Sequence, residues 1–149
     1  QRYVHTRVGV GGRMDTIQAA VLLAKIPNFR KELIDRQRVA DQYNSELSNT
    51  FQTPIIKKNR TSAWAQYTLR VNNRDNIIAK LKEQGIPTSV FYPIPLHLQE
   101  CFKYLNYKEN DIPISENASK EVISLPMNSF LNEEQIGYII SNLKNIYKI

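Results

Sequence analysis

The residues best suited to bind an anion lie in a glycine-rich turn near the start of the chain. Gly9, Gly11 and Gly12 fall within four positions, and Arg13 follows directly. Glycine lets the backbone bend freely and lets a ligand approach closely, because no Cβ stands in the way. The turn leads into an expected helix, whose first N–H groups carry partial positive charge, and Arg13 adds a planar cation. The pattern predicts a site for a phosphate or a carboxylate.

The glycine spacing does not by itself identify the ligand. Met14 stands where a dinucleotide-binding fingerprint needs a third Gly, and no strand-like run precedes the turn. An alternative is that the glycines only form a turn and that Arg13 only contacts solvent. Asp15 is best explained as the N-cap of the helix, because its side chain can bond the N–H of Gln18.

A second candidate group lies on the proline-stiffened loop of residues 92–97. His97 is one of two histidines, and Tyr92 offers a hydroxyl from the same loop. A rigid loop can hold an imidazole against a ligand. No carboxylate or nucleophile lies at a spacing that marks a catalytic pair, so a structural role for His97 stays open. We expect His5 to pack where the chain enters the glycine turn.

The composition is that of a soluble globular protein, with 42% hydrophobic and 23% charged residues. No run is long enough to span a membrane, and the first residues do not have the pattern of a signal peptide, so we expect a cytoplasmic location. Cys101 is the single cysteine and no Cys/His cluster has metal-ligand spacing, so we expect neither a disulfide nor a metal. The net charge of +6 favours anionic partners, although the basic residues are scattered.

Helical periodicity predicts two long helices before any strand. Residues 15–26 carry apolar side chains at helical spacing, and Pro27 should break or kink the helix. A second helix is predicted over residues 28–47. With the glycine turn, these helices make residues 1–50 an arm that precedes the compact part of the chain.

Residues 51–149 have the pattern of a small α+β domain. Strands are predicted over residues 51–56, 63–71, 88–91 and 122–125. Helices are predicted over residues 75–84, 98–105, 115–121 and from 133 onward. We expect a mostly antiparallel sheet with helices on one face, and an extended segment at residues 92–97 because of its prolines.

Several separated segments carry a resemblance to a known family. They are His5 with Gly9, Arg13 and Asp15-x-x-Gln18-Ala19-Ala20, then Ser62-Ala63-Trp64-Ala65-Gln66-Tyr67, Gly85-Ile86-Pro87-Thr88, Tyr92-Pro93-Ile94-Pro95-Leu96-His97-Leu98-Gln99 and Ser124-Leu125-Pro126-Met127. In this order, over nearly the whole chain, they resemble the DegT/DnrJ/EryC1/StrS family of sugar-nucleotide aminotransferases, which depend on pyridoxal 5'-phosphate (PLP).

The resemblance implies the C-terminal part of an aspartate-aminotransferase-type fold, in a homodimer that binds PLP mainly through its large domain. It implies that Gly11, Gly12 and Arg13 contact the cofactor, and that Arg13, Tyr92 and His97 contact a nucleotide-sugar substrate. The implied reaction moves an amino group from glutamate to a keto-sugar. The likeness is closest to members that act on UDP-linked 3-keto-hexuronic acids in the synthesis of surface polysaccharides such as lipopolysaccharide O-antigen.

Two departures from the family pattern affect the chemistry. Gly11 stands where the family has Asn, which removes a donor to the PLP phosphate unless backbone N–H groups replace it. The Schiff-base lysine of the family lies upstream of His5, and the first lysine here is Lys25. The resemblance therefore implies that this chain holds no catalytic residue and is inactive alone.

Two alternatives stay open. A protein of the same fold can dehydrate a sugar or act as a regulator, and the residue at the Schiff-base position distinguishes these cases. The positive charge, with Trp64 and Tyr67 close together, suggests an RNA-binding α+β module. In a regular strand these two rings would lie on opposite faces and could not form one stacking platform. We therefore expect no nucleic-acid partner.

Overall fold

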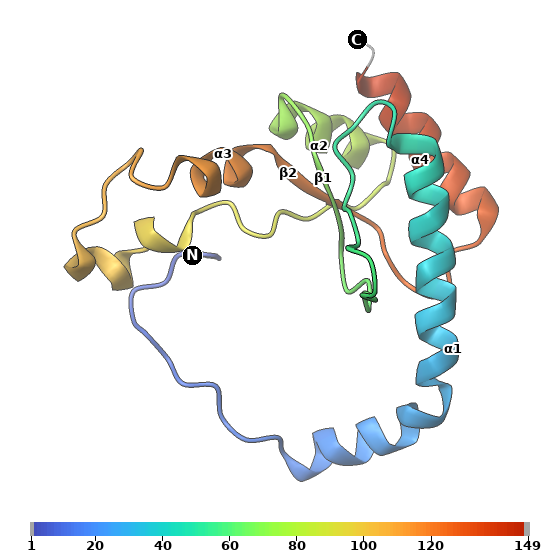
Figure 1. Cartoon of the computed structure of the whole chain (residues 1–149), viewed down its shortest axis with the longest axis horizontal. Coiled ribbons are helices and arrows are strands. Elements are labelled where there is room, and N and C mark those ends of the chain that lie inside the picture. The colour runs from blue at the N-terminus through green and yellow to red at the C-terminus, as the bar shows by residue number, and fades with distance from the viewer. Residues whose placement is uncertain (1, 148–149) are drawn as a thin grey trace.

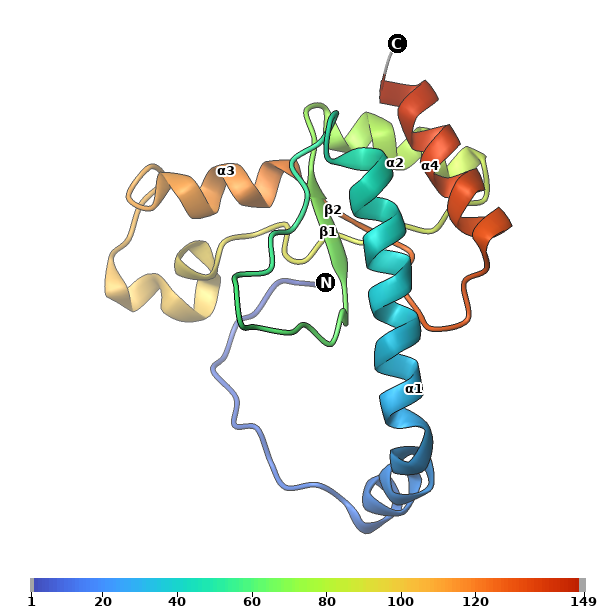
Figure 2. The ribbon, with the colours of Figure 1, turned by 45° about the vertical axis from the view of Figure 1, so that its right-hand side comes forward.

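The structure, a computed structural model, describes residues 2–147 (Figure 1). Its helices and strands follow in the order α1 (Thr16–Leu47), β1 (Tyr67–Arg70), α2 (Arg74–Glu83), the 3-10 helices η1 (Leu96–Leu98) and η2 (Glu100–Leu105), α3 (Pro113–Glu121), β2 (Val122–Leu125) and α4 (Glu133–Tyr147). Figure 2 shows α1 and α4 side by side, with α3 extending away from them. The α+β class is confirmed.

The two long helices expected near the start form one element, α1, with Pro27 inside it. Proline lacks an N–H, and its ring clashes with the carbonyl of the residue four positions earlier, which bends a helix. Figure 1 shows α1 changing direction between its blue and cyan halves. At its start, the Asp15 N–H donates to Oε1 of Gln18 at 3.2 Å. Pro27 therefore bends the helix without ending it.

The sheet is smaller than the sequence pattern suggests. β1 pairs antiparallel with β2, so that Tyr67 lies opposite Leu125. The strands predicted over residues 51–56 and 88–91 are each reduced to one bridge, Gln52 with Arg70 and Ser89 with Ser124. Pro54 removes a donor from the first of these segments. Both predicted strands are therefore much shorter than expected, but each segment does pair with the sheet.

The core lies between the second half of α1, the sheet, α2 and α4. Its fully buried side chains include Tyr43 and Leu47 of α1, Tyr67 of β1 and Leu143 of α4. The hydroxyl of Tyr43 donates to the carbonyl oxygen of Pro126 at 2.9 Å. Burial raises the pKa of Tyr43.

The domain boundary expected at residue 50 stays a prediction. The outer limits of the two expected domains, residues 1 and 149, lie outside the described residues.

The helices predicted in the second half of the chain are present, with one change of type. α2 begins after Asn73 and ends before Gly85, whose φ of 70° lies in the left-handed region that favours glycine. The helix predicted over residues 98–105 is formed by η1 and η2, short 3-10 pieces. No helix within residues 2–147 has the length and apolar character to cross a bilayer.

Trp64 lies outside β1, although the sequence pattern placed it in a strand. Its φ of 46° interrupts the extended backbone before Tyr67. The rings of Trp64 and Tyr67 therefore lie 5.8 Å apart in the core. The expectation that they face opposite sides was wrong, because side-chain alternation applies only within a regular strand. Both rings are buried and offer no surface on which a nucleic-acid base could stack.

The first half of α1 exposes its apolar residues. Ile17 is 80% exposed, and Leu23 and Ile26 are also exposed. The buried residues of the helix begin only at Val39, in its second half. α1 thus has two parts with different surroundings, joined at the bend near Pro27.

Candidate functional site

A cavity of about 610 Å³ opens where three parts of the chain meet. The N-terminal segment contributes Tyr3 and His5, the loop before η1 contributes Tyr92, and α3 contributes Ser115 and further residues. The rings of Tyr3 and Tyr92 meet edge to face with their centroids 5.8 Å apart. The cavity therefore combines aromatic walls with hydroxyl and imidazole groups, which suits a ligand that has both apolar faces and polar edges.

Tyr92 is the predicted substrate residue that the cavity presents most directly. The residue is 60% exposed and lines the cavity. The Phe91 ring packs against it edge to face at 5.7 Å. A phenolic hydroxyl can both donate and accept a hydrogen bond, as recognition of a sugar hydroxyl requires.

His97 lies behind the cavity wall. Its side chain is 6% exposed, and its Nε2 lies 3.1 Å from Oε1 of Glu116. The residue belongs to η1, where the Leu98 N–H donates to the carbonyl oxygen of Pro95 at 3.1 Å. The expectation of an extended segment over residues 92–97 was therefore wrong for Leu96 and His97, because nothing after the last proline prevents a turn. Direct contact of His97 with substrate stays a prediction.

Glu116 is the residue near this site that sequence reasoning missed. Both of its carboxylate oxygens accept from the Asn110 N–H, at 3.0 and 2.9 Å, and Oε1 accepts from the Ile112 N–H at 3.2 Å. The Asn110 N–H is the main cause of a lowered pKa for the Glu116 carboxyl. Burial opposes this effect, while Ile112 and His97 add to it. Glu116 is therefore ionised at neutral pH and is surrounded by donors.

Gln99 fixes the N-terminal segment against the same region. Its Nε2 donates to the carbonyl oxygen of Tyr3 at 3.0 Å, and its Oε1 accepts from the His5 N–H at 3.1 Å. The Cys101 N–H donates to the carbonyl oxygen of His5 at 3.0 Å. The His5 backbone is thus held in place, while its side chain is exposed at the cavity. This differs from the packing role expected for His5.

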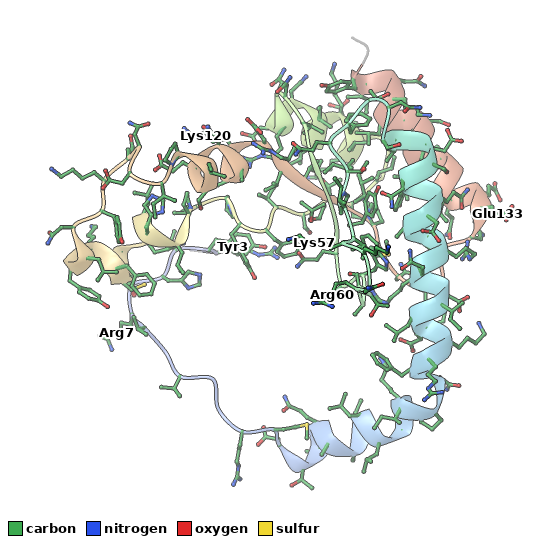
Figure 3. All side chains as sticks on the ribbon, viewed as in Figure 1. Tyr3, Arg7, Lys57, Arg60, Lys120 and Glu133 are labelled. Carbon is green, nitrogen blue, oxygen red and sulfur yellow. The ribbon has the colours of Figure 1, made fainter. Side chains whose placement is uncertain are left out.

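The glycine turn lies apart from this cavity. Gly11, Gly12 and Arg13 are exposed, and a Cβ built on either glycine meets no atom within 4 Å. Within residues 2–147, the Arg13 side chain makes no hydrogen bond or ion pair. Figure 3 shows Arg7 on the connecting segment, with its side chain directed away from the rest of the chain. The structure therefore brings together Tyr92 and His5, but not Arg13.

The open turn is compatible with a cofactor phosphate. Its backbone N–H groups are accessible, and Arg13 is free to pair with an anion. These contacts stay a prediction. No three His, Cys, Asp or Glu side chains among the described residues cluster as a metal site.

The sequence pattern of the DegT/DnrJ/EryC1/StrS aminotransferase family matches residues 1–144. This chain belongs to that family. The match confirms the resemblance seen in the separated motifs. It extends over the glycine turn, the loop that carries Tyr92 and the helix that carries Glu116.

Two curated relatives are considerably longer than this chain. It is 42% identical to the UDP-2-acetamido-2-deoxy-3-oxo-D-glucuronate aminotransferase of Pseudomonas aeruginosa, over 97% of this chain and 40% of that protein. It is 40% identical to a pleiotropic regulatory protein of Geobacillus stearothermophilus, over 99% of this chain and 41% of that protein. The chain spans about 40% of the length of these relatives.

Solved structures of family members share the fold. A DegT/DnrJ/EryC1/StrS aminotransferase from Brucella abortus is 36% identical with a TM-score of 0.84, and the match covers 100% of this chain and 40% of that one. DesV of S. venezuelae is 27% identical with a TM-score of 0.86, covering 100% of this chain and 41% of that one. The expected C-terminal part of an aminotransferase fold is confirmed.

Proposed function

We propose that this family member is the C-terminal region of a PLP-dependent aminotransferase that transfers an amino group from glutamate to a keto-sugar linked to a nucleoside diphosphate. The observation that carries this proposal is the 42% identity, over 97% of the chain, to a relative named for a UDP-linked 3-oxo-glucuronate. A UDP-3-keto-hexuronic acid is accordingly the proposed substrate. The proposal includes a cytoplasmic location and a role in making surface polysaccharides such as O-antigen.

The proposed substrate site is the cavity beside Tyr92. Its hydroxyl would bind the sugar or a phosphate, and the aromatic rings would pack against the apolar face of the sugar. The position of His5 in the same cavity supports this placement. His97 is buried against Glu116, and it contributes to this site through the loop that it anchors.

The proposed cofactor contacts are the N–H groups of Gly11 and Gly12 and the guanidinium of Arg13. When bound, PLP supplies the electron sink that amino transfer requires. Arg13 also pairs with an anionic part of the substrate. The glycine turn is not among the residues that line the Tyr92 cavity, which supports a homodimer in which the turn of one subunit completes the site of the other.

A chimaera tests the proposal. The C-terminal part of the Pseudomonas aeruginosa relative is replaced by this chain, and the purified protein is given PLP, glutamate and the keto-sugar nucleotide for which that relative is named. We expect an amino-sugar nucleotide as the product, detected by mass spectrometry. A chimaera that is folded by circular dichroism and binds PLP, yet forms no product, contradicts the proposal.

A regulatory role in the same fold is a second candidate. It is favoured by the 40% identity to the pleiotropic regulatory protein of Geobacillus stearothermophilus. An inactive chimaera that still binds the nucleotide sugar supports this alternative. RNA binding is not proposed. It was suggested by the aromatic rings of Trp64 and Tyr67, and both are buried.

A further inference from the structure

Two of the three parts of the chain that line the proposed substrate cavity form walls that come from different regions of the sequence. One wall is the loop that carries Tyr92 and continues into η1, and the other is α3 with Ser115 and Ser119. Among residues 2–147, the segments that flank these walls pair at the bridge of Ser89 with Ser124, outside the residues that line the cavity. The side-chain contact between His97 of η1 and Glu116 of α3 spans them from behind.

We propose that Glu116 is a positioning residue for the nucleotide-sugar site. Its carboxylate holds His97 and thereby fixes the Tyr92 loop against α3. This inference rests on the proposed function of the cavity. Glu116 does not line the cavity itself, so it acts on the substrate through the loop.

Glu116 is fixed on its own side before it meets His97. It lies in the first turn of α3, and its carboxylate accepts from the backbone N–H groups of Asn110 and Ile112. These donors belong to the segment that leads into α3, so the carboxylate moves with the helix. The Glu116 side chain is 7% exposed, so water has little access to the carboxylate and competes little with these N–H donors. The carboxylate is therefore a rigid acceptor.

The imidazole of His97 is fixed in turn by this acceptor. An ionised carboxylate has no proton to donate, so Nε2 of His97 must carry the proton in their 3.1 Å contact. The Tyr107 ring packs edge to face on the imidazole at 5.9 Å, and Phe102 and Leu105 line the same small hollow. The orientation of the ring is thus set by Glu116 on one side and by apolar groups around it.

Replacing the carboxylate by an amide of the same shape isolates this role. Glu116→Gln keeps the volume, but it puts an NH₂ group where Asn110 or His97 needs an acceptor. Glu46→Gln is the matched control, because it removes a surface ion pair, the one with Lys144 at 2.8 Å, far from the cavity.

The first experiment uses this chain and does not depend on catalysis. In ¹⁵N-edited and tyrosine-labelled NMR spectra, we expect an Nε2–H signal from His97. Glu116→Gln should shift both this signal and the ring signals of Tyr92, while Glu46→Gln leaves both unchanged. Tyr92 signals that do not move in Glu116→Gln overturn the inference, as does a His97 protonated only at Nδ1.

The second experiment measures kinetics in the chimaera. We expect Glu116→Gln to raise KM for the keto-sugar nucleotide about tenfold with kcat within about twofold, as for lost positioning of bound substrate. Combining it with His97→Ala should add no further effect, because the two residues act as one unit. A lower kcat with unchanged KM overturns the inference.

A second pair of variants decides the matter if Glu116→Gln fails to fold. His97→Gln keeps an N–H donor toward Glu116, whereas His97→Ala does not. In the NMR spectra of this chain we expect the ring signals of Tyr92 to stay near their parent positions in the first variant and to shift in the second, and equal shifts in both overturn the inference. If the parent chimaera is inactive, the proposed function fails, and the NMR result still decides whether Glu116 positions the loop.

Discussion

The indole Nε1 of Trp64 donates a hydrogen bond of 2.7 Å to Oε1 of Gln37, and so ties the segment before β1 to α1. Arg36 adds a second tie by donating to the carbonyl oxygen of Trp64 at 2.8 Å. Both bonds lie at the start of the part of α1 that enters the core. They fix the second half of the helix against the sheet that carries the cavity loops.

Trp64→Ala should therefore destabilise the chain strongly. The indole is 2% exposed, and deleting a buried aromatic side chain costs about 3–5 kcal/mol in free energy of unfolding. Urea unfolding followed by circular dichroism measures the change. Phe130→Ala is the control, because that ring is 85% exposed and its loss should cost less than about 0.5 kcal/mol. Equal effects would show that Trp64 does not hold the core.

The stability of the chain should fall in acid partly through Glu116. Its pKa in the folded state lies below the ordinary value of 4.5, so its contribution is complete above that value. The contribution is lost as the pH falls through the folded-state pKa. Denaturant unfolding from neutral pH down to about pH 3 should therefore show a smaller loss for Glu116→Gln than for the parent chain. Parallel curves would contradict this.

Tyr92→Phe should weaken substrate binding without impairing the chemical step. Removing one hydroxyl that bonds the sugar or a phosphate costs about 1 kcal/mol, so KM in the chimaera should rise about fivefold at constant kcat. Tyr104→Phe removes a hydroxyl from a ring that is 70% exposed and lies outside the cavity lining. That variant should keep the parent KM, and a similar rise in both would place the substrate elsewhere.

Gly11→Asn should strengthen PLP binding, because it restores the amide that the family pattern has at this position. The open space around Gly11 accommodates a side chain. One added hydrogen bond of about 1 kcal/mol lowers the Kd about fivefold, which absorbance titration of the chimaera with PLP can measure. Gly9→Asn is the matched control with equally open surroundings, and it should leave the Kd unchanged.

Local signals predicted where most helices lie, although the two helices expected over residues 15–26 and 28–47 form one element, α1. α2 begins and ends where Asn73 and Gly85 indicate, and α4 begins behind Asn132 as expected. These features depend on residues a few positions apart. The strands were predicted less well, because the segments around Gln52 and Ser89 each find only one bridge with a distant partner. Trp64 was placed on the wrong face, since a single residue of positive φ is not visible in an alternating pattern.

The candidate site was predicted only in part. The sequence identified Tyr92 and His97 from their loop and their resemblance to the family. It did not identify Glu116, which lies 19 residues beyond His97 and reaches it only after the intervening loop folds back. The place of His5 at the cavity was also missed, because it depends on the contact between Gln99 and a segment more than ninety residues earlier. Such pairings come from tertiary structure and leave no periodic signal.

The two side-chain bonds of Gln99 join it to residues 94 and 96 positions earlier and so close a long loop, as a disulfide does in many extracellular proteins. Reductants leave this closure intact, because it consists of amide hydrogen bonds. It depends on the amide character of one side chain, which is 4% exposed. Gln99→Glu would set a carboxylate oxygen against the carbonyl oxygen of Tyr3 and so weaken this closure, while the bond from the Cys101 N–H to the His5 carbonyl oxygen remains. A change at one buried amide would thus loosen the His5 side of the cavity at a position outside the hydrophobic core.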